Sequence, residues 1–330
     1  MESSIKRIRE SKLLTEYGPQ TSAAVALIIM CIILTFLTPS FLTAGNILSV
    51  LLQCSVNSIL ALGMTFIIIT AGIDLSVGAV VAFSAAIGGF LMQNYGLPPL
   101  LGLILILLLG ICAGFLNGSV ITRVGIPAFI VTLGSMQIWR GLALQLTQGG
   151  TSFGFSALIK YPGQGKFGPV PFAAVLVIVL YVLGSFILRH TTLGLNTYAI
   201  GGNEQAAKLS GIKIRKTKMI LYCMNGLLCG VAGLVLMGRL DSSTGIMANG
   251  YEMNAIAAVI IGGASFFGGE GNVWGSLIGA VLMGVLSNGL NLLGVSSYMQ
   301  TIVIGCVIVL AVSIDAMRRK MPVHTRIRAR

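Results

Sequence analysis

The chain has 330 residues, of which 55% are apolar and only 9% are charged, and its mean hydropathy is +0.94. A soluble domain carries about 25% charged residues, so a surface this poor in charge would not remain dissolved in water. The formal net charge of +12 does not indicate nucleic-acid binding, because the basic residues lie in loops between apolar runs, where they orient membrane proteins and contact anionic lipid. The composition therefore predicts an integral membrane protein.

The apolar runs predict about ten transmembrane helices, since each helix needs roughly 20 apolar residues to cross the hydrocarbon core. No polar stretch is long enough to fold separately, so residues 21–316 are expected to form one all-α membrane domain. The segments 1–20 and 317–330, the second of them basic, flank this domain. The predicted spans are 21–38, 48–70, 76–94, 98–118, 126–147, 170–188, 218–238, 253–268, 274–293 and 298–316.

The positive charges predict how these spans are oriented. With the N-terminus in the cytoplasm, 17 of the 21 basic residues fall on the cytoplasmic side, and only Lys160, Lys166 and Arg239 fall outside. Cytoplasmic loops of membrane proteins carry such an excess of Lys and Arg. Both termini and the loop 189–217 are therefore expected in the cytoplasm, and the loop 148–169, rich in Gly, Pro and Ser, in the periplasm.

The long cytoplasmic loop 189–217 contains the pattern of a short helix. Asn203 is a favoured N-cap, Glu204 suits the positive end of the helix dipole, and Gly211 is a C-terminal stop. A helix of about two turns is marginal alone in water. We predict a coupling helix that docks in a groove of a cytoplasmic partner with Ala206 and Ala207 against it; a helical linker on the membrane surface is the alternative. The predicted coupling residues are Gly202, Asn203, Glu204, Ala206, Ala207, Lys208, Ser210 and Gly211.

Three segments resemble the ribose-type branch of bacterial sugar ABC-transporter permeases: the loop 201–212, the segment 72–78 and the segment 288–298. The resemblance covers about residues 35–316. It implies the architecture of the ten-helix vitamin-B12-type importers, the bacterial inner membrane, and alternating access for ribose or a similar monosaccharide. It also implies three partners: a second permease copy, identical or not, a periplasmic sugar-binding protein, and a cytoplasmic ATP-binding subunit that binds the ATP and Mg²⁺.

The chain contains no nucleotide site of the P-loop type. The nearest fragment to G-x-x-x-x-G-K-[ST] is Gly165-Lys166-Phe167, which lacks the first glycine and the Ser or Thr. The power for transport is therefore expected from a partner, and we predict no catalytic residue, cofactor or metal site in this chain. A membrane enzyme would need Asp, Glu, His or Cys clustered at one depth, and the sequence offers no such cluster.

A secondary transporter or channel for a small neutral solute is the alternative function. Such a transporter is expected to hold a carboxylate within the membrane, and no Asp or Glu falls in the middle of a predicted span. Asp74 and Glu270 instead lie in glycine-rich turns at the cytoplasmic face, either as gate or ATPase contacts or as helix caps beside water. A faint similarity between residues 67–76 and 264–272, which contain these two turns, allows two related halves.

Polar residues inside the predicted spans are candidates for the translocation path. Arg140 lies toward the outer side of its span, either as a polar lining or gate ion pair, with Asp241 or Glu252 as partner, or as a snorkelling anchor beside Trp139. Buried amides also bind one another as packing groups, so the path is one of two interpretations for each. The possible path residues are Asn57, Asn225, Asn288, Asn291 and Arg140.

Overall fold

The computed structural model describes residues 2–320, and side chains from residue 20 to residue 317. Most of this part of the chain is helical, with four short strands. In chain order the elements are α1 (Glu2–Leu37), α2 (Ala44–Ile69), α3 (Val77–Tyr95), α4 (Pro99–Ser119), the π-helix η1 (Val120–Val124), α5 (Ala128–Leu146), β1 (Thr151–Phe153), α6 (Ala157–Gln164), β2 (Lys166–Phe167), β3 (Val170–Pro171), α7 (Phe172–His190), α8 (Thr192–Gly202), α9 (Glu204–Leu209), α10 (Ile214–Leu240), β4 (Ser242–Thr244), α11 (Tyr251–Ile261), α12 (Val273–Leu292) and α13 (Ser297–Lys320).

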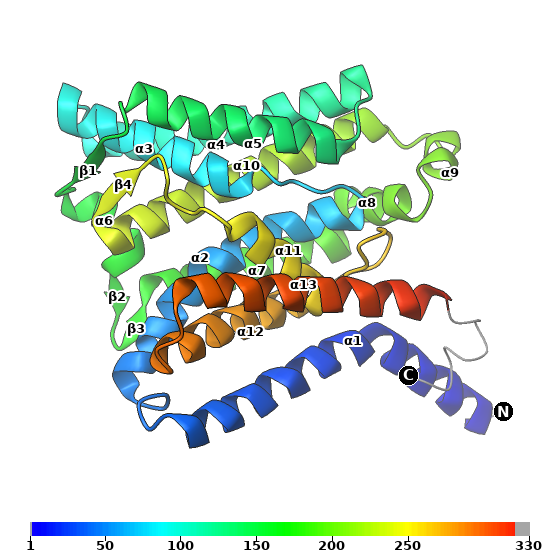
Figure 1. Ribbon diagram of the computed structural model, residues 1–330. Coiled ribbons are helices and arrows are strands. Elements are labelled where there is room, and N and C mark those ends of the chain that lie inside the picture. Colours follow the sequence, from blue (N-terminus) through cyan, green and yellow to red (C-terminus); the bar gives the residue numbers. More distant parts are fainter. Residues whose placement is uncertain (1, 321–330) are drawn as a thin grey trace.

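The long helices run between two ends of the molecule (Figure 1). One end, called here the α9 end, carries α8 and α9. The other, called here the β1 end, carries α6 and the two antiparallel strand pairs, β1 with β4 and β2 with β3. Helix α1 begins and α13 ends at the α9 end, as expected for chain ends on one side of a membrane.

Each of the ten predicted spans contains a helix, and eight of the described helices are long and apolar enough to cross a membrane. Helix α5 falls short because polar residues such as Gln137 and Arg140 lower its hydropathy, and α11 falls short because it ends at Ile261. The predicted span 253–268 is therefore wrong in its last third, where Gly263 and Gly268 at positive φ turn the chain. An all-α membrane protein is confirmed, while the count of ten and the orientation stay predictions.

The segments outside the predicted spans hold more structure than the sequence indicated. Residues 1–20 and 21–38 do not separate at a boundary, because α1 is one helix from Glu2 to Leu37. Most of the basic segment 317–330 lies outside the described residues. The two long loops contain helices α6 and α8, neither of which was predicted, since Pro162 stands within α6 and three glycines lower the helix propensity of α8.

Local sequence explains where several helices begin. The side chains of Thr43, Asn203 and Asn272 each accept a hydrogen bond from a backbone amide in the first turn of the helix that follows. Helices α4, α5 and α7 instead begin directly after a proline, whose fixed φ suits a helix start.

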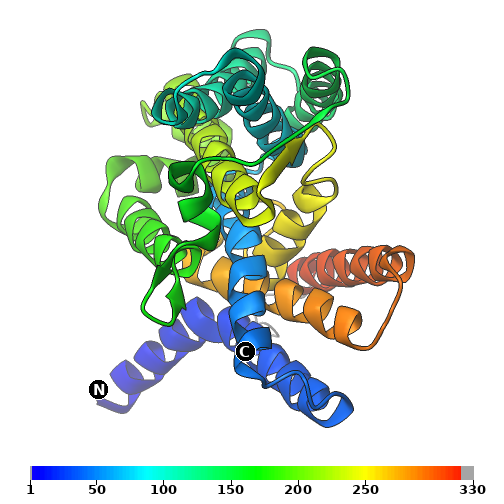
Figure 2. The same cartoon turned by 90° about the vertical axis from the view of Figure 1, so that its left-hand side faces the viewer.

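Helix α2 forms the centre of the bundle. Every residue from Cys54 to Ile69 is buried, and the helix packs against α7, α10, α11 and α12 (Figure 2). The two outermost helices differ sharply from it, since no described side chain of α13 is buried and few of α1 are. Their exposed side chains are mainly Ile, Val and Leu, as expected for surfaces that face lipid or another membrane protein.

Two irregular segments interrupt the bundle and meet inside it. The chain leaves α2 at the α9 end and runs back through residues 70–76 before α3 begins; residues 245–250 run inward from the β1 end before α11 begins (Figure 1). The segment 245–250 contacts the first turn of α3 at Gly78, directly after residues 70–76, and a Cβ at Gly78 would overlap the Ala248 carbonyl oxygen and the Glu252 carboxylate. Irregular backbone at membrane depth is tolerated where protein buries it, and broken helices of this kind form sites in transporters.

The segments 67–76 and 264–272, which show a faint similarity in sequence, do not occupy equivalent positions in the fold. Residues 67–76 connect the full-length α2 to α3, whereas 264–272 connect the short α11 to α12. The segments 70–76 and 245–250 each precede a helix that begins inside the bundle, α3 and α11 respectively. In position, therefore, the counterpart of 70–76 is 245–250.

The orientation can be tested by labelling. In a variant with the six native cysteines replaced, single cysteines at the exposed positions Ser156 and Ser210 should react with a membrane-impermeant maleimide from opposite sides, Ser156 from the periplasm. Whole cells and inverted vesicles provide the two sides. Labelling of both positions from the same side would contradict the topology.

Candidate functional site

The predicted coupling helix is present. Helix α9 covers Glu204–Leu209, and its first turn is capped by the Asn203 Oδ1 atom, which accepts a hydrogen bond from the Ala206 amide at 2.9 Å. Gly211 follows at φ +82°, a conformation that favours glycine, and ends the helix. Apart from Ala207, the residues from Gly202 to Gly211 are all exposed. Leu209, with 89% of its surface exposed, is the most prominent apolar side chain of the loop.

Ala207 does not face outward. Only 4% of its surface is exposed, because α9 packs on α8 and on the first turn of α10. The prediction that Ala207 lies against a partner is therefore wrong; Ala206 and Leu209 are the small and apolar side chains left for such a contact. Periodicity over six residues was too short to assign the buried face.

The helix before α9 is joined to the bundle through backbone atoms. At the end of α8, a Cβ on Gly201 would overlap the Ile69 carbonyl oxygen and approach the Gly269 amide nitrogen. That amide in turn donates a hydrogen bond to the Ile69 carbonyl oxygen at 2.9 Å. The end of α8, the end of α2 and the turn after α11 thus meet with no side chain between them. We call this contact of Ile69, Gly201 and Gly269 the glycine joint.

A side chain of α8 strengthens the joint. The Tyr198 hydroxyl donates a hydrogen bond to the Gly271 carbonyl oxygen at 2.7 Å, in the same turn that contains Gly269. Since α8 leads directly into α9, a displacement of α9 would be transmitted to α2 and to the turn before α12. Few side chains lie between these backbones that could change rotamer and absorb the movement.

A polar cluster holds the interrupted segment between α2 and α3. The Asp74 carboxylate accepts three hydrogen bonds: from the Ser76 amide at 2.9 Å, from the Ser76 hydroxyl at 2.6 Å, and from the Asn225 Nδ2 atom at 2.9 Å. The Asn117 Nδ2 atom donates to the Ser76 hydroxyl oxygen at 2.9 Å. All four residues are buried, and they connect the segment to α4 and to the middle of α10.

This position corrects two interpretations of Asp74. With 3% of its surface exposed, Asp74 neither contacts an ATPase nor caps a helix beside water. It also lies deep in the bundle, as does Glu252 at 7% exposure, so the absence of Asp and Glu from the middle of the predicted spans does not exclude a buried carboxylate. Hydropathy could not reveal this position, because Asp74 falls outside the apolar runs. Glu270 is exposed, next to Gly269, which contacts the end of α8, and its role in a gate or contact stays a prediction.

Arg140 stabilises the other interrupted segment. Its Nη1 atom donates hydrogen bonds to the carbonyl oxygens of Gly245 at 2.9 Å and Met247 at 2.7 Å. The predicted ion pair with Asp241 is wrong, since Asp241 accepts from Lys160 at 3.3 Å, and no ion pair of Arg140 with Glu252 occurs in the described part of the chain.

The alternative interpretation of Arg140 as a snorkelling anchor is also wrong. Trp139 is 8% exposed and packs its ring 5.0 Å from that of Phe83, so it is not an interfacial residue. Arg140 is half-buried and is bound to two carbonyl groups. Its function here is to satisfy backbone oxygens in a segment that forms no regular structure.

The predicted path residues do not gather along one line. Asn288 exchanges two hydrogen bonds with Asn46, at 3.0 and 2.9 Å, and Asn291 accepts one from Gln300 at 2.7 Å; these contacts tie α12 to α2 and α13. The packing interpretation therefore fits Asn288 and Asn291. Asn225 belongs to the Asp74 cluster through its Nδ2 atom. The amide oxygens of Asn57 and Asn225 are buried and accept no hydrogen bond in the described structure, so a role of these two in the path stays a prediction.

Comparison with known proteins identifies the family. A family model described as "Branched-chain amino acid transport system / permease component" matches residues 46–312. The chain belongs to this family of transport-system permeases. It is 42% identical to the ribose import permease protein of Bacillus subtilis (strain 168), with 94% of this chain and 95% of that protein covered.

Further relatives carry sugar permease names. The ribose import permease protein of Escherichia coli (strain K12) is 41% identical over 90% of this chain and 93% of its own length. The D-allose transport system permease protein of the same organism is 36% identical over 85% of this chain and 86% of its own length. No solved structure gives a significant match.

An exchange of Asp74 and Asn225 tests the buried cluster. Asn225→Asp would place two carboxylates side by side, which costs several kcal/mol in a buried site. We expect little monodisperse protein and a lowered Tm. The double variant Asp74→Asn/Asn225→Asp restores one carboxylate and one amide, and the amide oxygen introduced at position 74 can still accept from Ser76, so most of the loss should be recovered. A double variant no more stable than Asn225→Asp would contradict this pairing.

Proposed function

We propose that this chain is the membrane-spanning permease subunit of an ATP-binding-cassette importer in the bacterial inner membrane, and that it carries ribose or a similar monosaccharide. The observation that carries the proposal is the 41–42% identity to ribose import permeases over at least 90% of this chain. Identity to the allose permease, at 36%, is lower, which favours ribose.

The partner subunits follow from this assignment. A cytoplasmic ATP-binding subunit binds ATP and Mg²⁺ and docks on α9 through the exposed residues from Gly202 to Gly211, with Leu209 and Ala206 at the centre of the contact. A periplasmic binding protein delivers the sugar to the β1 end. A second permease copy covers the apolar faces of α1 and α13, which are the least buried of the helices long enough to span a membrane.

The proposed mechanism uses the two interrupted segments as gates. Docking and release of the ATP-binding subunit move α9, and the glycine joint passes the displacement to the end of α2 and the turn after α11. Residues 70–76 then shift relative to residues 245–250, because α3, which follows residues 70–76 directly, contacts Ala248 through Gly78. Asp74 and Arg140 keep the unpaired backbone of each segment satisfied while it moves. The contact at Gly78 separates the two sides of the path, so the sugar site opens to one side of the membrane at a time, which is alternating access.

The alternative, a secondary transporter or channel, predicts transport without a partner. The buried Asp74 does not favour it, because both carboxylate oxygens are occupied by Ser76 and Asn225 rather than open to a moving ion.

Reconstitution separates the two functions. Proteoliposomes that contain this chain, its ATP-binding subunit and its sugar-binding protein should accumulate labelled ribose only when ATP is supplied on the side of the ATP-binding subunit. Equal ribose uptake by liposomes that contain this chain alone would contradict the proposal and support the alternative.

Leu209→Arg tests the docking site in the same system. The loss of a buried leucine contact weakens binding by about 1.5–3 kcal/mol, roughly 10- to 150-fold in affinity. We expect normal amounts of permease in the membrane, since Leu209 is 89% exposed, but loss of ATPase co-purification and of uptake. Leu158→Arg, at a 46% exposed position of α6 at the β1 end, is the control and should keep the ATPase bound. Retention of the ATPase by Leu209→Arg would place the docking site elsewhere.

A further inference from the structure

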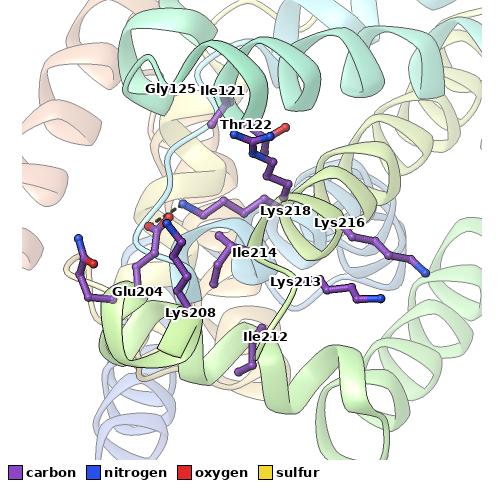
Figure 3. A pocket seen from close by; sticks show the side chains of 12 residues that line it. Ile121, Thr122, Gly125, Glu204, Lys208, Ile212, Lys213, Ile214, Lys216 and Lys218 are labelled. Carbon is purple, nitrogen blue, oxygen red and sulfur yellow. Dashed lines mark hydrogen bonds and ion pairs between the residues drawn. The ribbon is translucent and has the colours of Figure 1, made fainter. Parts of the chain in front are cut away.

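A basic pocket opens beside the coupling helix. It has a volume of about 710 Å³ and lies between η1, helix α9 and the first turns of α10 (Figure 3). Five basic side chains line it and only one acidic one, so the lining carries a net charge of +4. The basic residues are Lys208, Lys213, Arg215, Lys216 and Lys218, and the acidic one is Glu204.

One ion pair within the pocket leaves most of this charge uncompensated. Lys218 reaches across to Glu204, with 2.8 Å between the Nζ and Oε2 atoms, and Lys208 points to the same place (Figure 3). Lys213 and Lys216 extend in another direction, toward the outer edge (Figure 3). Among the described residues no other carboxylate pairs with any of the five. Basic residues that only orient a membrane protein need no cavity, so a cavity whose lining carries this excess of positive charge indicates an anionic ligand.

The surroundings of the pocket favour a ligand that is also apolar. Its lining includes Ile121, Ile212 and Ile214 next to the basic side chains. The same π-helix presents Val120 and Val124 to the outside, 37% and 68% exposed, beside the apolar surface of α5. The pocket therefore lies where a lipid-facing surface ends and the basic loop begins. Basic pockets between helices on the cytoplasmic side are suited to the head groups of anionic lipids.

We propose that this pocket binds the phosphate head group of an anionic phospholipid from the cytoplasmic leaflet, with Lys208 and Arg215 at the phosphate and the acyl chains along η1 and α5. The lipid would bridge α9 to η1, two elements otherwise separated by the pocket, and so set how firmly α9 is held when the ATP-binding subunit docks. The proposal uses the proposed orientation but not the identity of the sugar, and lipid binding can be measured on the permease alone.

Native mass spectrometry of the purified, delipidated permease tests the proposal with three probes: phosphatidylglycerol, phosphatidylcholine and inorganic phosphate. We expect phosphatidylglycerol to bind at least about tenfold more tightly than phosphatidylcholine. Arg215→Gln should weaken phosphatidylglycerol about fivefold and Lys208→Gln/Arg215→Gln about 25-fold, as expected for each basic charge removed near an anionic head group. Arg189→Gln, which removes the same charge from an exposed position outside the pocket, is the matched control and should bind as the native chain does.

Four results would overturn the proposal. Equal binding of the two lipids, or equal loss in Arg189→Gln and Arg215→Gln, would show that the pocket does not select an anionic head group. Displacement of phosphatidylglycerol by millimolar inorganic phosphate would identify a free phosphate as the ligand instead. Unchanged lipid binding together with lost ATPase association in Lys208→Gln/Arg215→Gln would assign the pocket to the ATP-binding subunit.

Discussion

The rest of this structure depends on one contact, the hydrogen bond that the Gly269 amide donates to the Ile69 carbonyl oxygen. The backbone of Gly201 packs directly against both groups. This contact joins α2, the most buried of the long helices that the structure describes, to the loop of the α9 end that carries the proposed docking helix. Close backbone contact is rigid because no side chain can change rotamer between the parts. A movement of α9 would therefore reach the centre of the bundle rather than be absorbed at its surface.

The need to satisfy backbone groups that lie outside regular helices explains why charged side chains lie inside a membrane domain. A permease that opens alternately needs backbone that is not fixed in a continuous helix, and such backbone has unpaired amide and carbonyl groups. Asp74 accepts from the amide of Ser76 in one interrupted segment, and Arg140 donates to the carbonyl groups of Gly245 and Met247 in the other. These charged side chains supply the hydrogen bonds that helix geometry would otherwise provide, and they do so at the two sides of the Gly78 contact.

The sequence predicted what depends on composition and local pattern. Hydropathy predicted a helix for every span, and the Asn203 cap and Gly211 stop predicted α9 to within about two residues, because both are local backbone effects. Contacts between distant segments were not predictable, because they depend on how the helices pack. Examples are the inward orientation of Ala207, the burial of Asp74 against Asn225, and the binding of carbonyl groups by Arg140. The similarity between residues 67–76 and 264–272 likewise did not predict that the two irregular segments within the bundle are 70–76 and 245–250.

The most direct test of this account is the number of sugar molecules transported per ATP hydrolysed in the reconstituted importer. Gly201→Ala adds only a methyl group, but at the glycine joint it must push Ile69 and Gly269 apart, whereas Gly134→Ala, in the exposed face of α5, meets no atom within 4 Å. We expect both variants to assemble with the ATP-binding subunit and hydrolyse ATP, and the transport ratio to fall several-fold in Gly201→Ala alone. An equal ratio in the two assembled variants would contradict transmission through the joint.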